Sequence, residues 1–476
     1  MGSYLATIVC ALGILGLFAL DWDRRSRTSL ALWIPVVWLL LGASRMASLA
    51  AVFGVTIVEA SSAQEMLKGS PFERLVFSSL VALSLIVLAR RGWKAGRLLS
   101  ANPAIVLFLL YCGASILWAD YPDVTFKRWI KALGDLAMVL IVLTDEDPSA
   151  ALKRLLARVG FVLIPASILL AKYYPALGLG WSAWGGATAY VRGVATSKNE
   201  LGGICLLFGL GSVWRFCLAL RDREETHRLR ILTAHGIILT MVAWLFWRAH
   251  TATALGCFVM ASTLAVTTNF QALTRRLWVL HAVVAAMISV SYVSLFLDVG
   301  SDLLESIGRD PTLTGRTELW NRVLAMTPNS FLGAGFESFW LPPRLNYLWS
   351  LYWWHPNEAH NGYIEVYINL GWIGIVLLAL ILLTGYRKVF GAVRQNPEEG
   401  GLWLGYFFAG LVYNFTESAV RIMHPVWIFF LLATIAASAV SVPKAVPALN
   451  IEQREDLSEW ATPYREFDLG SHGETH

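Results

Sequence analysis

Charged residues are scarce in this chain: Asp, Glu, Lys and Arg make up 15% of its 476 residues, whereas 56% are hydrophobic. An average soluble domain is about 25% charged. The composition therefore excludes a soluble globular protein and predicts an all-α protein that crosses a membrane many times. The formal net charge of +5 is small for this length and gives no indication of a nucleic-acid partner.

Cysteine is also rare, and its positions exclude two classes of site. All five cysteines fall inside apolar runs, with the spacing of neither metal ligands nor a disulfide framework. They are Cys10, Cys112, Cys205, Cys217 and Cys257. We expect them to be small apolar side chains within helices.

Two further signals are missing. The apolar run 4–20 has no basic residue before it and is followed by Asp21–Arg27, so we expect a retained first span rather than a cleaved signal peptide. Neither an internal repeat nor a matched pair of Gly/Pro-broken spans is found, which argues against an inverted-repeat transporter.

Long apolar segments dominate the rest of the chain. A helix needs roughly 20 apolar residues to cross a bilayer, and the segment 47–58 is too short for that, so we expect it to be interfacial or re-entrant. The sequence predicts about 12 to 13 transmembrane helices. Their expected positions are 4–20, 27–43, 73–90, 103–119, 127–144, 153–171, 201–219, 231–247, 252–268, 277–297, 361–385, 402–418 and 424–440.

Lys and Arg collect in alternate loops, which predicts the orientation. The basic loops, such as 221–230 and 387–394, are expected to be cytoplasmic. The loop 172–200, the long segment 298–360 and the N-terminus then lie outside. We divide the chain into transmembrane helices 1–10 (1–297), a periplasmic loop or lid (298–360), C-terminal transmembrane helices (361–441) and a cytoplasmic polar tail (442–476), which is expected to be disordered.

The loop 172–200 presents basic side chains just before a span. Arg192, Lys198 and Asn199 would lie at a helix N-terminus, where backbone N–H groups and the helix dipole favour an anion such as phosphate. The alternative is interfacial anchoring by basic side chains. Glu200 in the first helical turn is expected to be a capping residue.

The segment 298–360 is too rich in aromatic residues for a disordered loop. Short helical patterns at 316–326 and 338–350 predict a lid that folds back on the membrane surface. Its tryptophans, Trp320 and Trp340 among them, suit the apolar faces of sugar rings, although an interfacial aromatic belt explains them equally well.

This segment also carries two arginines in a glycine-punctuated turn. A planar guanidinium matches phosphate oxygens and stays charged when desolvated. Arg316, which opens a predicted helix, is the better candidate for binding a pyrophosphate. Arg309 follows Gly308 and precedes Asp310, so a structural pair or a solvated position is its alternative.

His360 is flanked by polar groups at the mouth of a span. It can remove a proton from an attacking hydroxyl or orient that hydroxyl by a hydrogen bond, and a purely structural histidine is the alternative. Asn361 and Glu365 lie on nearly the same helical face. A carboxylate about one turn inside a membrane span, as at Glu365, needs a partner or a functional role. Glu417 and Arg421 are expected to form an i,i+4 ion pair, with Arg421 able to reach the same cavity.

The Asp21-Trp22-Asp23 sequence has the form of a divalent-cation motif, but it lies in a predicted cytoplasmic flank among arginines. We therefore interpret it as a topological flank and expect no metal site there.

A family pattern connects these outer segments. His360-Asn361, nine residues, Gly371, two residues and Gly374 resemble the histidine signature of the O-antigen ligase family and related polysaccharide polymerases (Wzy-type), and the chain looks most like the exopolysaccharide polymerases. Upstream pieces resemble the same superfamily in the same order. They are Arg192-Gly193, Lys198-Asn199, Leu201-Gly202, Gly315-Arg316, Trp320 and Gly333-Ala334-Gly335-Phe336.

The resemblance implies an inner-membrane glycosyltransferase similar to GT-C-type folds, with its active site facing the periplasm. Such enzymes transfer a glycan from undecaprenyl pyrophosphate to an acceptor hydroxyl with inversion, without a metal or other cofactor. Arg192 and Arg316 match the arginines that hold the pyrophosphate, and His360 matches the histidine that activates or positions the acceptor. Family members carry both termini on the cytoplasmic side, whereas the thirteen spans predicted here place the N-terminus on the opposite side.

The leading hypothesis is a polymerase that joins lipid-linked repeat units into exopolysaccharide or O-antigen. The alternative is an O-antigen ligase that transfers glycan to lipid A core or another acceptor, and a lipid-linked glycan transporter or a structural scaffold is disfavoured. The expected partners are the undecaprenyl-pyrophosphate donor, a glycan or lipid-linked acceptor, membrane lipid and other polysaccharide assembly proteins. Sugar identity, linkage, acceptor, chain-length control and oligomeric state leave no readable signal.

Overall fold

The protein is described here by a computed structural model. It describes residues 2–23, 27–44, 71–182, 188–222, 227–270, 276–296 and 312–440. Three predictions lie outside the described residues: the short apolar segment 47–58, Arg309 and the polar tail 442–476.

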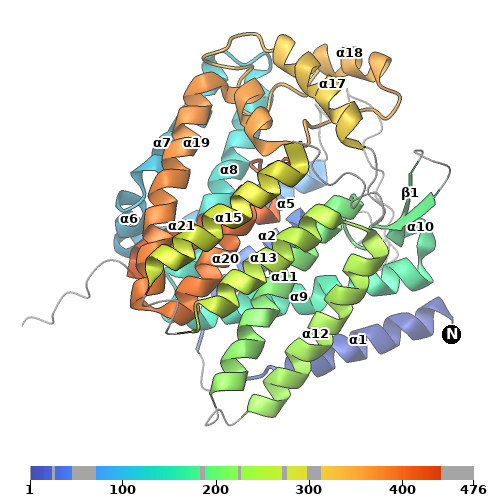
Figure 1. Cartoon of the computed structure of the whole chain (residues 1–476), viewed down its shortest axis with the longest axis vertical. Helices are drawn as coiled ribbons and strands as arrows, with labels where there is room; N and C mark the ends of the chain where they lie inside the picture. The colour runs from blue at the N-terminus through green and yellow to red at the C-terminus, as the bar shows by residue number, and fades with distance from the viewer. Residues whose placement is uncertain are drawn as a thin grey trace, which may run out of the picture.

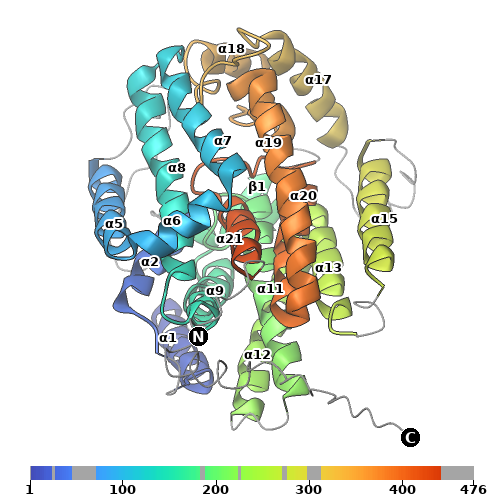
Figure 2. The same ribbon diagram turned by 90° about the vertical axis from the view of Figure 1, so that its left-hand side faces the viewer.

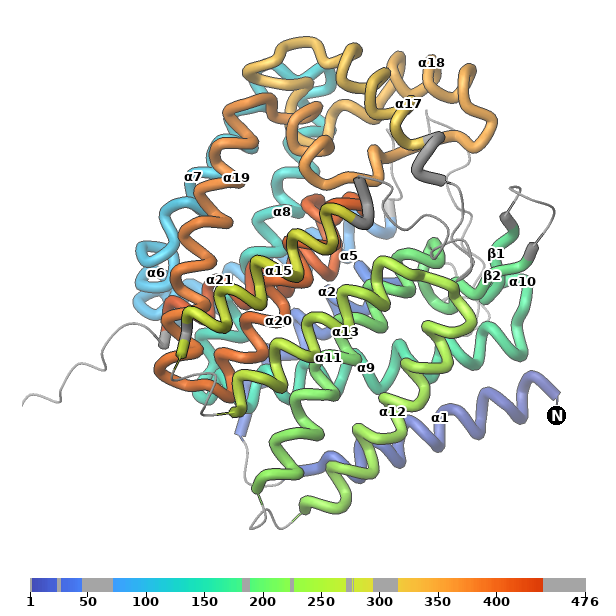
Figure 3. Tube along the Cα trace, in the orientation of Figure 1, coloured from blue at the N-terminus to red at the C-terminus, as the bar shows by residue number. Residues whose placement is uncertain are grey.

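The described chain is helical almost throughout, with a single two-stranded hairpin (Figures 1 and 3). A helix occupies each of the apolar segments that the sequence predicts. The elements are α1 Ser3–Leu20, η1 Leu30–Leu32, α2 Trp33–Gly42, α5 Pro71–Arg90, α6 Gly92–Ser100, α7 Pro103–Ala114, η2 Ser115–Leu117, α8 Pro122–Leu143, α9 Pro148–Tyr173, α10 Pro175–Gly178, β1 Leu179–Ser182, β2 Thr188–Val191, α11 Lys198–Arg221, α12 Arg228–Ala249, α13 Ala252–Thr267, α15 Leu277–Phe296, α17 Thr312–Ala325, α18 Arg344–Leu351, α19 Gly362–Gln395, α20 Pro397–Tyr413 and α21 Pro425–Val440. The all-α membrane fold is confirmed.

By length and apolar composition, fewer of the described helices qualify as full spans than the 12 to 13 that the sequence predicts. Within the described residues, six helices are long and apolar enough to cross a membrane, namely α1, α5, α9, α11, α12 and α19. The predicted span 103–119 corresponds to α7 and η2, which end at Leu117 and meet α6 at an angle of 94°, as a broken span or a re-entrant loop. Ala101 and Asn102 separate α6 from α7, because Pro103 at the start of α7 disfavours a helical conformation at Asn102.

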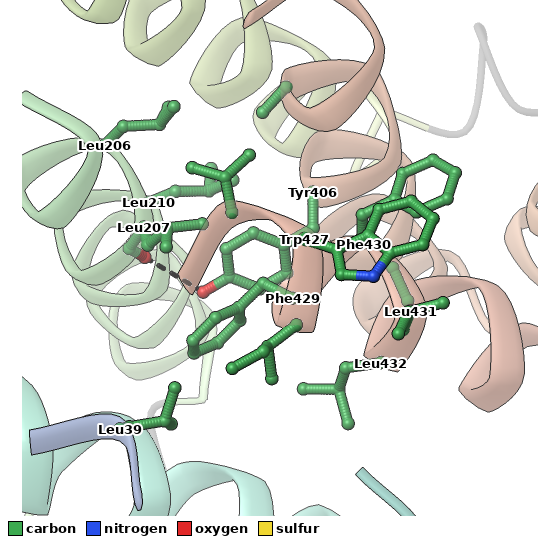
Figure 4. Close-up of a cluster of buried hydrophobic side chains, with 14 of the residues drawn as sticks. Leu39, Leu206, Leu207, Leu210, Tyr406, Trp427, Phe429, Phe430, Leu431 and Leu432 are labelled. Carbon is green, nitrogen blue, oxygen red and sulfur yellow. Dashed lines mark hydrogen bonds between the residues drawn. The ribbon is translucent and has the colours of Figure 1, made fainter. Parts of the chain in front are cut away.

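The centre of the bundle is a layer of aromatic and leucine side chains between α11, α20 and α21 (Figure 4). The Tyr406 hydroxyl is fully buried there and donates a 3.0 Å hydrogen bond to the Leu207 carbonyl. Gly410 lets α20 approach Phe430 closely, since a β-carbon at that position would lie 2.7 Å from the ring. All five cysteines are free thiols, as predicted.

The outer loops predicted to lie together do share one end of the bundle. The Thr7 and Tyr174 hydroxyls are 2.8 Å apart, which joins the start of α1 to the end of α9. Asp21, just after α1, instead pairs with Arg215 near the far end of α11 at 2.9 Å. The start of α1 therefore lies on the side of the loop that follows α9, in agreement with the predicted N-terminal side.

Helices α17 and α18 lie over the end of the bundle where α19 begins (Figures 1 and 2). The predicted helix 316–326 corresponds to α17. The predicted helix 338–350 begins only at Arg344, because Pro342 and Pro343 precede it and cannot donate backbone hydrogen bonds.

Helix α19 is broken at Gly371, whose φ of +63° is non-helical. The loop that follows α17 fills the break: the N–H groups of Ala334 and Gly335 donate to the carbonyls of Ile368 and Asn369 at 3.0 and 2.8 Å. A β-carbon on Gly371 would lie 2.2 Å from the Phe331 carbonyl carbon. Two glycine motifs that are separate in the sequence thus form a single joint at the break in α19.

We expect Gly371→Ala to destabilise the protein, because alanine adds both a strained positive φ, costing about 1–3 kcal/mol, and a backbone clash. Gly256→Ala is the matched control, since nothing lies within 4 Å of a β-carbon built there and alanine favours a helix interior. Melting temperatures in detergent test the pair. Equal melting temperatures would show that the joint does not need glycine.

Candidate active site

Charged side chains from four segments meet at the end of the bundle under α17. The segments are the N-terminus of α11, the loop before α19, helix α17 and the loop 414–424 between α20 and α21. Their contacts form a row of alternating charges, which we call the ion chain. In spatial order it consists of Glu200, Arg421, Glu358, His360, Glu417 and Arg316.

His360 is the centre of the ion chain. Its Nδ1 lies 3.1 Å from a carboxylate oxygen of Glu358 and 3.4 Å from one of Glu417. Two carboxylates at Nδ1 favour a proton on that nitrogen, which directs Nε2 away from them. The side chain is 21% exposed, so the imidazole remains accessible.

An arginine pairs with each of these carboxylates. Arg421 contacts Glu358 at 2.6 Å and Glu200 at 3.2 Å. Arg316 lies 3.7 Å from Glu417 and donates a 2.7 Å hydrogen bond to the Thr416 carbonyl. Arg316 and His360 therefore lie on the same carboxylate.

The predicted i,i+4 pair between Glu417 and Arg421 is wrong. Helix α20 ends at Tyr413, so the two residues lie in a loop rather than on one helical face. Asn414 ends the helix, because its side-chain oxygen accepts hydrogen bonds from the N–H groups of Ala419 and Val420 at 2.9 and 3.1 Å. The turn that results points Glu417 and Arg421 at different partners.

The carboxylates decide the charge of the imidazole. Burial favours the neutral form of His360, but Glu358 and then Glu417 outweigh it and raise its pKa to about 9. Burial likewise opposes the charge of Glu358, yet Arg421 and His360 hold the pKa of that carboxyl well below its usual range. By contrast, burial and the charge of Arg421 lower the pKa of nearby His424 to about 3. His360 is thus charged at neutral pH, and His424 is not.

The backbone of His360 has a left-handed conformation with φ +50°, which is uncommon for a residue with a side chain. Its neighbours hold it there. The Ala359 N–H donates to Glu365 at 3.0 Å, and the Ala359 carbonyl accepts from the Trp320 indole at 2.7 Å. Asn361 caps α19 by accepting from the N–H groups of the first helical turn at 3.0 and 3.1 Å.

Trp340 completes this support, because its indole donates a 2.6 Å hydrogen bond to the second oxygen of Glu365. Both predicted sugar-binding tryptophans, Trp320 and Trp340, therefore position His360 through their indole N–H groups. Stacking of their rings on a sugar stays a prediction, as do substrate contacts by Asn361 and Glu365.

The first turn of α11 joins the site through Asn199, whose amide donates a 2.7 Å hydrogen bond to Glu417. The N-cap of α11 is Ser197, whose hydroxyl accepts from the Glu200 N–H at 3.2 Å. The Glu200 carboxylate instead accepts from the Thr196 N–H at 3.3 Å and pairs with Arg421. Arg192 donates to the Leu177 carbonyl at 3.1 Å, in the turn before β1. The Lys198 ammonium lies 5.8 Å from the centre of the Tyr190 ring. That Arg192 and Lys198 meet the substrate stays a prediction.

Glu358, His360 and Glu417 place one ligand atom each within 4.8 Å of one another, which is a spacing that a metal ion can use. The donor set argues against a cation, however. Both carboxylates already face arginines, and an imidazolium offers no lone pair to a metal. The geometry suits charge pairing, and metal independence stays a prediction.

Sequence reasoning missed the carboxylates as members of the site. Glu358 was included only among the polar groups that flank His360, and Glu417 was interpreted as a structural partner of Arg421. The contact between Glu417 and His360 spans 57 positions, so no local spacing reveals it. The polar content of the loop 414–421, next to a span, was the available signal.

Comparisons with known proteins connect this geometry to a family. Residues 227–379 match the family model for O-antigen ligase, a range that includes Arg316, His360 and Glu365. The chain is also similar to the exopolysaccharide production protein ExoQ of Rhizobium meliloti (strain 1021), with 24% identity over 308 residues. That match covers 62% of this chain and 66% of the relative, slightly less than two thirds of its length.

We expect Glu358→Gln to lower the pKa of His360 by at least about one unit, because one of the two carboxylates that favour its charged form is lost. Titration of ¹³C-labelled histidine by NMR in detergent measures the shift. Glu318→Gln is the control, since Glu318 is 66% exposed on α17 and pairs with Arg322. An unchanged pKa in Glu358→Gln would contradict the assigned contact.

Proposed function

We propose that this member of the O-antigen ligase and polysaccharide polymerase superfamily is a glycosyltransferase that polymerises undecaprenyl-pyrophosphate-linked repeat units into exopolysaccharide. The active site faces the periplasm from the inner membrane. One observation carries the proposal: an imidazole held between two carboxylates shares one of them with Arg316, at the end of an apolar helix bundle.

This arrangement supports the two tasks of glycosyl transfer. The guanidinium of Arg316 stabilises the negative charge that develops on the departing pyrophosphate. The carboxylates keep a proton on Nδ1, and in the minority form that lacks the second proton, the unprotonated Nε2 of His360 acts as a general base toward the hydroxyl of the acceptor. A carboxylate partner on the far side of an imidazole favours the proton transfer, because it stabilises the imidazolium that forms.

The reaction is a single displacement. The acceptor oxygen attacks the anomeric carbon of the donor from the face opposite the pyrophosphate, and its proton passes to the unprotonated Nε2 of the neutral form of His360. The new glycosidic C–O bond forms as the C–O bond to the pyrophosphate breaks, and the bonding electrons leave with the lipid pyrophosphate. Attack from the opposite face inverts the anomeric centre.

The remaining candidates take supporting roles. We assign Arg192, Lys198 and Arg309 to the donor phosphates, because cations near an anionic leaving group lower the cost of its charge. Arg421 is held by two carboxylates and fixes Glu358 in place. Asn361, whose amide also donates to the Phe415 carbonyl at 3.1 Å, holds the backbone of His360.

The polymerase is preferred over a ligase that acts on lipid A core because the relative ExoQ is named for exopolysaccharide production. A ligase uses the same donor chemistry and differs in the acceptor. The two functions therefore differ in their products rather than in the geometry around His360.

We expect His360→Ala and Arg316→Ala each to lower transfer at least about 100-fold, the usual cost of losing a general base or a charge-stabilising donor. Release of undecaprenyl pyrophosphate from a glycan-loaded donor, measured with purified protein in nanodiscs, tests both. Arg322→Ala is the control on the same helix, since Arg322 pairs only with exposed Glu318 among its described ion pairs. Full activity in either site variant would exclude its assigned role.

With lipid-linked repeat units as the only substrate, we expect the wild-type protein to make a ladder of longer lipid-linked chains. A chelator in the same reaction should leave the rate unchanged, because the carboxylates of the site face arginines. Gel analysis of the glycans reads both outcomes. A protein that elongates nothing here but glycosylates lipid A core would be the ligase instead.

A further inference from the structure

Two arginines lie on α9 near the end of the bundle opposite the ion chain. Helix α9 begins at Pro148 and is long and apolar enough to cross a membrane. Arg154 and Arg158 are one helical turn apart, so they share a face of α9 and repel each other. We call them the arginine pair. At the usual rise per residue, Arg158 lies about 15 Å along the helix axis from Pro148. A cation that deep in an apolar span needs a counter-ion.

The two arginines have very different contacts. Arg154 donates hydrogen bonds to the Thr28 hydroxyl at 2.6 Å and to the Asp23 carbonyl at 3.3 Å, in the chain between α1 and α2. The Arg158 guanidinium lies 4.4 Å from the centre of the Trp33 ring, at the start of α2. Within the described ranges, its buried Nη1 has no hydrogen-bond partner and no carboxylate pairs with it. Arg158 is thus held by the face of a ring, and its charge is not balanced there.

The carboxylates near the start of α9 have other partners. Asp21 and Asp145 form ion pairs with other arginines, at 2.9 and 3.3 Å. Asp147 accepts a hydrogen bond from the first turn of α9 and so caps the helix. Asp23 is one carboxylate beside two arginines. Residues 24–26, which lie outside the described ranges, are Arg-Arg-Ser and add positive charge only. With these neighbours included, the arginine pair keeps a net positive charge.

The surface beside the arginine pair is apolar. In the segment that contacts the pair, Leu30 is 86% exposed and Trp33 is 49% exposed. Helices α1 and α2 both pack against α9, and most side chains of α1 are exposed (Figure 2). Such a surface suits acyl chains, and tryptophan favours the boundary between acyl chains and headgroups. A planar guanidinium matches two phosphate oxygens, and basic sites between helices at a membrane face bind acidic headgroups.

We propose that the arginine pair and Trp33 bind the phosphate of an acidic phospholipid, in the membrane leaflet opposite the ion chain. The phosphate supplies the counter-ion that Arg158 lacks in the described chain, and the long arginine side chain reaches it by extending toward the headgroups. The acyl chains cover Leu30 and the exposed side of α1, so the lipid holds α1 and α2 against α9. The site takes no part in glycosyl transfer and does not depend on the proposed function.

The variant Arg158→Gln tests the site, because it removes the charge and keeps a polar side chain. Binding of phosphatidylglycerol to the full-length protein in detergent is measured by native mass spectrometry, as the Kd of the first bound lipid. Arg158→Gln should raise this Kd about 5-fold, the usual contribution of one basic side chain at an anionic membrane surface. The Kd of phosphatidylethanolamine, whose headgroup carries no net charge, should be higher and should be the same in both proteins.

Arg394→Gln is the matched control, since it removes the same charge from an exposed position at the end of α19, on the same membrane face. It should leave the Kd for phosphatidylglycerol unchanged. An equal loss of binding in both variants would show a general effect of net charge. An equal Kd in the wild type and Arg158→Gln would assign the counter-ion to a carboxylate of an undescribed segment, 223–226 or 441–476. Either result overturns the inference, as does equally tight binding of phosphatidylethanolamine.

A second variant keeps the test decisive if Arg158→Gln does not insert. Trp33→Leu retains the charge and removes the ring that holds the guanidinium, so it should raise the Kd for phosphatidylglycerol about 3-fold, within the range of a cation–π contact. Millimolar inorganic phosphate should leave the lipid bound, because it has no acyl chains to cover Leu30. Displacement of the lipid by phosphate, or an unchanged Kd in Trp33→Leu, would contradict a phospholipid site.

Discussion

The structure depends on one arrangement of charges: an imidazolium between two carboxylates, each of which also faces a guanidinium. Six ionisable side chains at the end of an apolar bundle would be costly one by one, because each loses solvation. In alternating order they stabilise one another, and the charge of His360 follows from Glu358 and Glu417. The helices and loops around the ion chain can be understood as the means of holding this order.

Three backbone devices hold it. The break of α19 at Gly371 receives the glycine turn 333–335, whose backbone hydrogen bonds hold the loop after α17 against α19. Asn361 caps that beginning and sets the unusual backbone of His360 beside it. Asn414 ends α20 and folds the loop that carries Glu417. Polar side chains near the end of an apolar helix thus serve as caps and turn residues, so that the ionisable groups remain available for chemistry.

The local sequence predicted much of this arrangement of helices and site residues. Apolar runs predicted the positions of the long helices. The tryptophans and short helical patterns of the segment 298–360 predicted a partly helical lid. The histidine, Arg316 and Asn199 were identified as site residues, and they do converge. The errors concern helix ends: the pair of Glu417 with Arg421 assumed that a helix continues past Tyr413, and the predicted helix 338–350 begins only at Arg344.

Composition and hydrophobic period alone determined that the chain is a helical membrane protein, because burial of apolar runs in lipid leaves the backbone few alternatives. The residue types at the histidine and at the arginines likewise indicated which chemistry is available. Only the tertiary structure decided which carboxylate faces which cation, since Glu200, Glu358 and Glu417 come from three segments whose approach depends on helix ends and glycine contacts. Charge pairing acts over a few ångströms in space and leaves no period in the sequence.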